Sequence, residues 1–387
     1  MPVWHAKTRA AVANGELAVV GIAQEQHPER MALYAAWQRL DWPLLFDPFN
    51  LTDAEVVLNA YLVAPGGVIW KAGARPDDLE AFLAADFDSS AALAGMPEPR
   101  LVALDGEAVV PTDAGGLKPV AAQHVSRALF GAGEPRLAAL RHLAFDTLTV
   151  DEPRAWFRRG VALRMLFDDE GPRTNAAASA SLFTGAVDAW ARALERRPSQ
   201  YIWRRRLQQY GPALDKPYPF YDWIDEAQAT LLERGDAPIP LRAALTPTER
   251  LGRDAPVREP GAEPDPDARL PRDEGWFEVD VTVVADTQGR PRASAHVSIT
   301  PLAAEDAEWN DEAGPVVVWI EGVEAVVPAQ RLEHRPAPGA DARERRTLSF
   351  ELDARPGAVL SGYAVLQVCE ADVCRTVRHG FSFTLKR

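Results

Sequence analysis

Two cysteines near the end of the chain are the residues best suited to do chemistry. Cys369 and Cys374 are separated by Glu-Ala-Asp-Val, and no third cysteine occurs in the 387 residues. A thiolate is the nucleophile of thiol–disulfide exchange and also a ligand for soft metals. The pair is therefore a candidate redox site, a structural disulfide, two inert thiols or half of a metal site. A metal would need further ligands, and His379 is the only histidine nearby in sequence.

The spacing of the pair suits a hairpin. The four residues between the cysteines can form a hairpin loop, which would place the cysteines opposite each other. Opposed positions on antiparallel strands bring Cβ atoms to about 4.5–5.5 Å, close to the roughly 3.5–4.5 Å of a disulfide. So small a ring gains about 2 kcal/mol of stability, and exposed or strained disulfides are the reducible ones. Glu370 and Asp372 would raise the pKa of a nearby thiol while Arg375 would lower it, so a structural disulfide and an exchange site both stay open.

The composition restricts the partners of the protein. Its 42 Lys and Arg against 56 Asp and Glu give a formal charge of −14, which argues against a nucleic acid or an anionic membrane as the main partner. No apolar run approaches the roughly 20 residues of a membrane span, and the first residues lack the apolar core of a signal peptide. We therefore expect a cytoplasmic protein from the chain as written, and an exported one if its true start lies upstream. No Walker loop, HExxH, GxSxG or CxxC motif occurs, so no cofactor and no metal are expected.

The elements that must position the cysteines are predicted to be strands. Apolar and polar residues alternate in FEVDVTVVAD and RPRASAHVSIT, and four further β segments follow with turn signals between them. This series predicts an antiparallel sandwich over 276–387. Residues 251–275 are rich in proline and charge and contain no aromatic residue, which predicts a disordered linker in front of the sandwich.

The first 87 residues alternate helical and strand patterns. LAVVGIA (17–23) is typical of a buried parallel strand, Pro28 opens a helix, and Pro65-Gly66-Gly67 predicts the turn of an antiparallel hairpin. These patterns predict an α/β domain over 1–87 with a parallel pair followed by a hairpin. Residues 88–135, which are small and interrupted by prolines, are expected to be an irregular connection.

A helical region is predicted over 136–250. Trp156 and Gly160 share one helix and Phe183, Ala186 and Trp190 share the next, a pattern that resembles tetratricopeptide repeats. Trp, Tyr and Arg dominate interface hot spots, so this region also offers a candidate peptide-binding surface. Its residues are Trp203, Arg204, Arg205, Tyr221 and Trp223. The alternative is that the aromatic residues pack the repeat while the arginines pair with nearby acids, namely Asp215, Asp222, Asp225 and Glu226.

The N-terminal residues carry a family resemblance. The stretch from WHAKT (4–8) through VVGIAQEQHPERMALYAAWQRLDWPLLFDPFNL to AYLVAPGGVIW resembles the redoxin branch of the thioredoxin-like superfamily. The resemblance implies a thioredoxin-like domain over 1–87, but this chain has neither its active cysteines nor its first strand, and Leu58-Asn59 stand where a cis-proline is expected. It therefore implies a degenerate domain, or a misplaced start. His5 and His27 lie at the active-site end by this resemblance, and we expect them to be surface or helix-capping residues.

The C-terminal residues resemble a second family. AEWNDE (307–312), PVVVWIE (315–321) and GYAVLQVCEADVCRTV (362–377) are similar to the immunoglobulin-like N-terminal domain of the thiol:disulfide interchange reductases. In that family two hairpin cysteines exchange disulfides with thioredoxin-like partners, which implies this role for Cys369 and Cys374. The sequence thus leaves two functions open, which are thiol–disulfide exchange with a thioredoxin-like partner and a non-enzymatic interaction scaffold.

Overall fold

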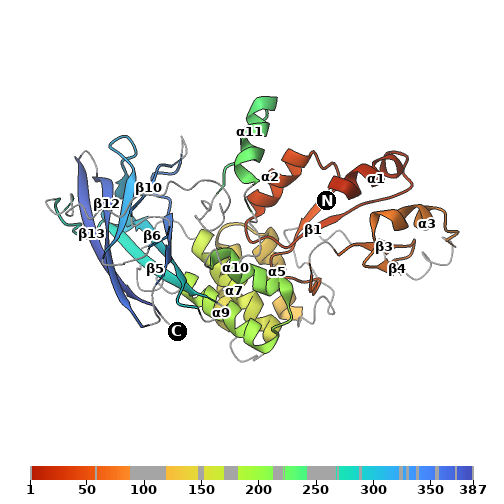
Figure 1. Ribbon diagram of the computed structural model, residues 1–387, viewed down its shortest axis with the longest axis horizontal. Helices are drawn as coiled ribbons and strands as arrows, with labels where there is room; N and C mark the ends of the chain where they lie inside the picture. The colour runs from red at the N-terminus through yellow and green to blue at the C-terminus, as the bar shows by residue number, and fades with distance from the viewer. Residues whose placement is uncertain are drawn as a thin grey trace.

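The computed structural model arranges the chain in three parts along its longest axis (Figure 1). An N-terminal α/β part is at one end, helices lie in the middle, and antiparallel sheets are at the other end. The structure describes residues 2–56, 59–87, 119–146, 152–169, 182–211, 221, 223–241, 267, 270–286, 290–321, 326–327, 331–336, 340–353, 357–370 and 373–385.

The α/β part contains the predicted parallel pair and the predicted hairpin. Helix α1 (Pro2–Ala13) is followed by β1 (Gly21–Ala23), α2 (Pro28–Gln38) and β2 (Leu44–Phe46), and β1 pairs with β2 in parallel across α2. Strands β3 (Tyr61–Val63) and β4 (Ile69–Ala72) form the antiparallel hairpin, which the short helices η1 (Pro76–Asp78) and α3 (Leu79–Leu83) follow. The two pairs are separate sheets rather than one.

The first strand is shorter and more exposed than its apolar sequence predicts. Only Gly21–Ala23 pairs with β2, while Val20 and Ile22 are 53% and 48% exposed. Among the described strands, β1 has a neighbour on one side alone. Its apolar run is therefore not enclosed as it would be inside a larger parallel sheet.

The middle of the chain is helical and starts earlier than predicted. It comprises α5 (Pro119–Phe130), α6 (Gly133–Arg141), η3 (His142–Asp146), α7 (Pro153–Asp169), α9 (Leu182–Arg196), α10 (Tyr201–Tyr210) and α11 (Ile224–Arg234). The irregular connection expected over 88–135 is therefore wrong from Pro119 onward, and residues 88–118 lie outside the described residues. No helix in the described ranges is long and apolar enough to cross a membrane.

Helices α7 and α9 form the centre of the helical core. Gly160 of α7 lies against the ring of Trp190 of α9. Helix α11 leaves this core and packs on α2 instead, through Leu33, Ile224 and Leu231. The helical region predicted over 136–250 is thus shared between two cores.

Two antiparallel sheets make up the C-terminal part. One sheet has the order β5-β6-β11-β9, formed by Phe277–Ala285, Ala293–Pro301, Arg346–Leu352 and Val326–Val327. The other has the order β10-β8-β12-β13, formed by Arg331–His334, Val316–Glu321, Val359–Glu370 and Val373–Thr384, and β7 (Ala307–Trp309) also pairs with β12. The predicted antiparallel strands are thus confirmed, and both sheets contribute apolar side chains to one core.

Strand β6 explains how the sandwich joins the helices. Its apolar residues face the sandwich core, and its alternate residues Ser294, His296, Ser298 and Thr300 are buried on the other face. On that face His296 Nε2 is 2.7 Å from the backbone oxygen of Tyr210. The hydroxyl of Thr282 on β5 is 3.2 Å from that of Thr184 on α9. The helices are therefore bound to a polar face of the first sheet, and the cysteines lie on the second.

Candidate functional site

The two cysteines are bonded to each other next to the turn of the last hairpin. Cys369 of β12 and Cys374 of β13 are directly paired in the register, their Cα atoms are 4.1 Å apart, and their sulfurs form a disulfide. The hairpin expected from the spacing is thus confirmed, and the alternative of two free thiols is wrong for this structure. Across the described residues no three His, Cys, Asp or Glu side chains are grouped so that they could hold a metal.

The disulfide lies on the face of its sheet that points away from the core. Successive strand residues point to opposite faces, and Val368 is buried in the core, so Cys369 faces outward. Cys369 is half-buried and Cys374 is exposed. Across the other side of β12, Cys369 pairs with Glu308 of β7, whose carboxylate is 2.9 Å from Arg343. The Cys369 half of the disulfide therefore lies beside an ion-paired carboxylate, and the Cys374 half is accessible to solvent.

Of the charged residues expected to act on the cysteine pair, only Arg375 has a described side chain. Arg375 lies with its guanidinium carbon 5.2 Å from the ring centre of Trp276. The side chain of Glu370 and all of Asp372 lie outside the described residues. His379, which was considered as a metal ligand, is 2.7 Å from a carboxylate oxygen of Asp273. Arg375 and His379 therefore have other contacts, with Trp276 and Asp273.

Strand β13 is an edge strand among the described strands, and the end of the predicted linker follows it. Arg378 N–H donates to the oxygen of Pro271 at 2.8 Å, and Asp273 N–H donates to the oxygen of Arg378 at 2.9 Å. Leu270 packs on the outer face of the sheet beside Tyr363. The disordered linker expected over 251–275 is therefore wrong for residues 270–275, because the edge of β13 and an apolar patch bind them.

A shallow depression of about 400 Å³ lies on the same outer face. Its lining residues belong to the far ends of the strands from the cysteines and include Glu321, Ser361, Tyr363, Arg378, Phe381 and Ser382. The guanidinium carbon of Arg378 is 3.9 Å from the ring centre of Tyr363. The depression does not include either cysteine, so it is not part of the disulfide site.

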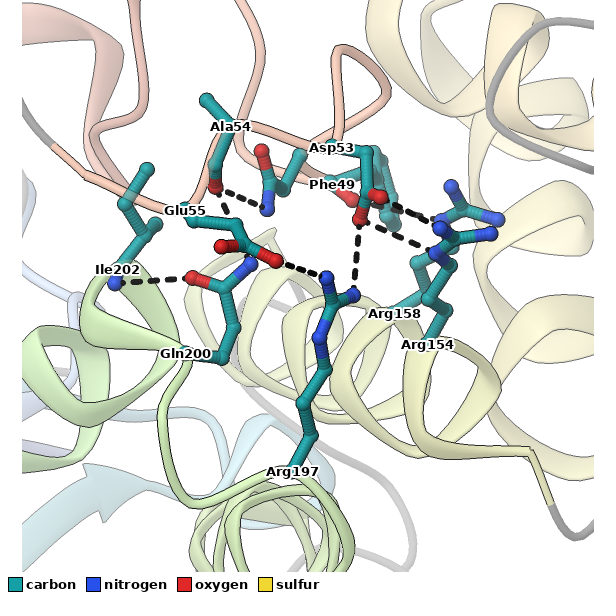
Figure 2. Close-up of polar contacts among 10 residues, drawn as sticks. Phe49, Asp53, Ala54, Glu55, Arg154, Arg158, Arg197, Gln200 and Ile202 are labelled. Atoms are coloured by element: carbon teal, nitrogen blue, oxygen red, sulfur yellow. Dashed lines mark hydrogen bonds and ion pairs between the residues drawn. The ribbon is translucent and has the colours of Figure 1, made fainter.

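The loop after β2 is bound to the helices by a group of ion pairs, drawn in Figure 2. The Asp53 carboxylate accepts from Arg154 Nε at 3.0 Å and from Arg197 Nη1 at 3.2 Å, and Arg197 also pairs with Glu55. Gln200 donates to the backbone oxygen of Ala54 at 3.2 Å. In α/β folds ligands bind beyond the carboxyl ends of the strands. Here that edge contacts α7, α9 and α10.

The loop after β1 is bound to the same helices by buried polar groups. His27 is 2% exposed, its Nε2 is 3.2 Å from the hydroxyl of Tyr210, and its Nδ1 is 3.6 Å from Asp168. Burial lowers the pKa of His27 well below its usual value, and the guanidiniums of Arg30 and Arg206, among others, act in the same direction. His27 occupies the N-cap position of α2, as the capping alternative predicts, although its side chain makes no capping hydrogen bond. The surface alternative is wrong, because α7 and α10 cover this loop.

Burial also shifts the pKa values of Asp168 and Tyr210, the two groups beside His27. It raises the pKa of Asp168, which Arg164 opposes from 3.0 Å, and it raises the pKa of the Tyr210 hydroxyl. Tyr210 also stacks on Trp190 and receives the His296 hydrogen bond at its backbone oxygen. All three parts of the protein therefore meet at Tyr210, a residue whose role the sequence pattern did not signal.

The five predicted partner-binding residues do not form one exposed surface. Trp203 is 1% exposed and stacks on Phe157, while Tyr221 and Trp223 are half-buried against α2. Of the two arginines, Arg204 donates to the oxygen of Pro198, and Arg205 lies over the ring of Tyr201. Asp215 and Asp222 lie outside the described residues. The packing alternative is closer to the structure for the aromatic residues, since α10 buries its aromatic face.

Three comparisons with known proteins found no relative of this chain. No protein-family model, curated protein or solved structure matches the chain.

Proposed function

We propose that the protein exchanges disulfides with a partner dithiol through the Cys369–Cys374 bond. The observation that carries this proposal is the position of the bond, which joins paired residues on an edge hairpin and has the exposed Cys374 on one side. The core lies on the opposite face of the sheet, so a partner can approach the bond without entering it. Exposed disulfides are the reducible ones.

The exchange begins at the more accessible sulfur. A partner thiolate bonds to the Cys374 sulfur, the bond to Cys369 breaks, and Cys369 leaves as a thiolate that takes a proton from water. The partner's second thiolate then attacks the partner sulfur of the mixed disulfide and releases Cys374 as a thiolate, which is protonated in turn. The partner is oxidised to a disulfide and this chain is reduced to two thiols. Arg343 offsets the charge of Glu308 beside the departing Cys369.

The other parts of the chain support this site rather than share its chemistry. The α/β part contains no cysteine, and its strand-end loops are bound to the helices through Asp53 and His27. We propose that it is a degenerate thioredoxin-like domain and that the sandwich is immunoglobulin-like. The parallel pair followed by a hairpin supports the first assignment, and the two antiparallel sheets around one core support the second.

The reduction potential of the pair tests the proposal. The protein is equilibrated with thiol–disulfide buffers, and the two thiols are counted by alkylation and mass measurement; no other cysteine contributes to the signal. We expect a potential above about −300 mV and reduction by a thioredoxin-like CxxC protein. A potential well below that value would identify a structural disulfide and favour the scaffold function instead.

Single-cysteine variants test which sulfur is attacked. C369S leaves the exposed Cys374, and C374S leaves the half-buried Cys369 as the matched control. Each is activated as a mixed disulfide with thionitrobenzoate and mixed with a thioredoxin-like protein that keeps only its first active-site cysteine. We expect C369S to form the protein–protein disulfide several-fold faster on a non-reducing gel. Equal rates, or faster capture by C374S, would contradict the proposed order of attack.

A further inference from the structure

We propose that protonation of His27 releases the segment between β1 and α2 from the helices, so that this junction is closed at neutral pH and opens in acid. The segment is residues 24–27, and we name it the β1–α2 segment. It follows the carboxyl end of β1, and in α/β folds ligands bind at that edge of the sheet. Helices α7 and α10 cover the segment in the closed structure. Its release therefore uncovers an edge that is otherwise inaccessible.

Polar contacts with α10 hold the β1–α2 segment in place. Arg206 Nη2 donates to the backbone oxygen of Gln24 at 2.9 Å, and Arg206 Nη1 donates to the side chain of Gln26. His27 Nε2 is 3.2 Å from the hydroxyl of Tyr210. The segment reads Gln-Glu-Gln-His, so all of its own side chains are polar. Water can take over the hydrogen bonds of such groups when the segment leaves α10.

Helix α2, which follows the segment, does not belong to the core of α7 and α9. Its Leu33 packs on Ile224 and Leu231 of α11, in a cluster separate from that core. Figure 1 shows α2 and α11 side by side at the upper edge of the helical part. Before the segment, β1 pairs with β2 alone among the described strands. The segment can therefore move together with α2 and α11 while α7 and α9 stay packed.

The closed structure disfavours a proton on His27. The side chain is 2% exposed and occupies the N-cap position of α2, at the positive end of the helix dipole. Burial lowers its pKa, and so do the guanidiniums of Arg30, Arg164 and Arg206, which face it from α2, α7 and α10. An imidazolium at this position would lie among like charges and out of contact with water.

The carboxylates near His27 are engaged elsewhere. Asp168 lies 3.6 Å from His27 Nδ1, which is longer than a hydrogen bond, and accepts from Arg164 Nε at 3.0 Å. Glu25 accepts from the hydroxyl of Tyr221 at 2.6 Å and from two backbone N–H groups of its own segment. Further charged groups act on Asp168, namely Arg345, Glu29 and Asp169. Neither Asp168 nor Glu25 hydrogen-bonds the imidazole, so a protonated His27 is more stable where it reaches water.

Native-state hydrogen exchange of the full chain tests this release between pH 7.5 and 5.5. Exchange in residues 21–30 is followed by mass spectrometry and corrected for the intrinsic pH dependence of the amide reaction. A histidine in water has a pKa of about 6.5, so the opening constant should rise by up to about tenfold per pH unit below that value. H27Q should abolish the rise, because glutamine stays neutral. H5Q is the matched control, since His5 is 2.8 Å from Asp41 in the same part of the protein, and it should keep the rise.

D168N separates His27 from the other buried group that could take up a proton. Burial raises the pKa of Asp168, so its protonation could also open the junction in acid. We expect the rise to persist in D168N; its loss there, or its persistence in H27Q, would assign the proton to another group and overturn the proposal. An opening constant in the wild type that does not change with pH would overturn it too, because His27 would then be protonated only on global unfolding. An equal rise in β5 and β6 would show global unfolding in place of local release.

Discussion

Replacing Gly160 with alanine is expected to destabilise the protein, although alanine is the better helix former. An ideal Cβ at Gly160 would lie 2.4 Å from Nε1 and 2.5 Å from Cδ1 of Trp190. Trp190 is 0% exposed and stacks on Tyr210 with ring centres 5.7 Å apart. The ring therefore has no open space into which it can move, and the added methyl group must separate α7 from α9.

The size of the effect follows from two opposing contributions. Alanine in place of glycine inside a helix gains about 1 kcal/mol. Overpacking of a filled core costs about 1–3 kcal/mol, and a contact this short with a buried indole belongs at the upper end. The expected net loss for G160A is therefore about 2 kcal/mol in the free energy of unfolding.

A matched glycine on the facing helix provides the control. A Cβ at Gly185 of α9 meets only Leu163, at an ordinary distance of 3.4 Å. G185A should therefore stabilise the protein by about 0.5–1 kcal/mol through helix propensity alone. Urea unfolding followed by circular dichroism measures both variants. The packing argument fails if G160A is as stable as G185A, because the contact with Trp190 is the only difference invoked.

Three further predictions concern the buried histidine, the ion pairs and the disulfide. His27 stays neutral in the fold while the unfolded chain binds a proton below its usual pKa of 6.5, so stability should fall as the pH drops through that value, by at most about 1.4 kcal/mol per unit. H27Q should flatten this slope in urea unfolding at several pH values, and an unchanged slope would count against it. D53N removes the carboxylate shared by two arginines, and should cost about 1–2 kcal/mol and speed amide exchange in residues 47–56; unchanged exchange there would contradict this. Replacing both Cys369 and Cys374 with serine should cost about 2 kcal/mol and leave the sandwich folded, because β12 and β13 pair along their whole length; loss of its thermal transition would show otherwise.

The features that the sequence predicts well are those set by neighbouring residues. The hairpin at Pro65-Gly66-Gly67 and the pairing of Cys369 with Cys374 depend on turn chemistry and strand alternation within a few residues. The alternation in β5 and β6 likewise predicts the face that enters the sandwich core. These patterns are local, so they hold whatever the rest of the chain does.

The features that the sequence does not predict depend on contacts between distant segments. His27 is buried because α10, about half the chain away, covers its loop. Leu270 to Gly275 look like linker until the edge of β13 is placed beside them. Hydrophobic patterning also does not say which aromatic residue of a helical region stays accessible. Trp203 is buried on Phe157, whereas Trp156, the residue before Phe157, lies among arginines at the surface.

The polar outer face of β6 has a consequence for dissecting the protein. A domain expressed without its neighbours often aggregates, because their removal exposes an apolar surface. Separation of the sandwich from the helices would instead uncover hydroxyls and an imidazole, from Ser294, His296, Ser298 and Thr300, which water can solvate, together with one valine, Val284 of β5, that packs in the helical core. A fragment beginning just before Leu270 would retain both the strip that lines β13 and the cysteine hairpin. The sandwich is therefore the portion of the chain best suited to independent expression.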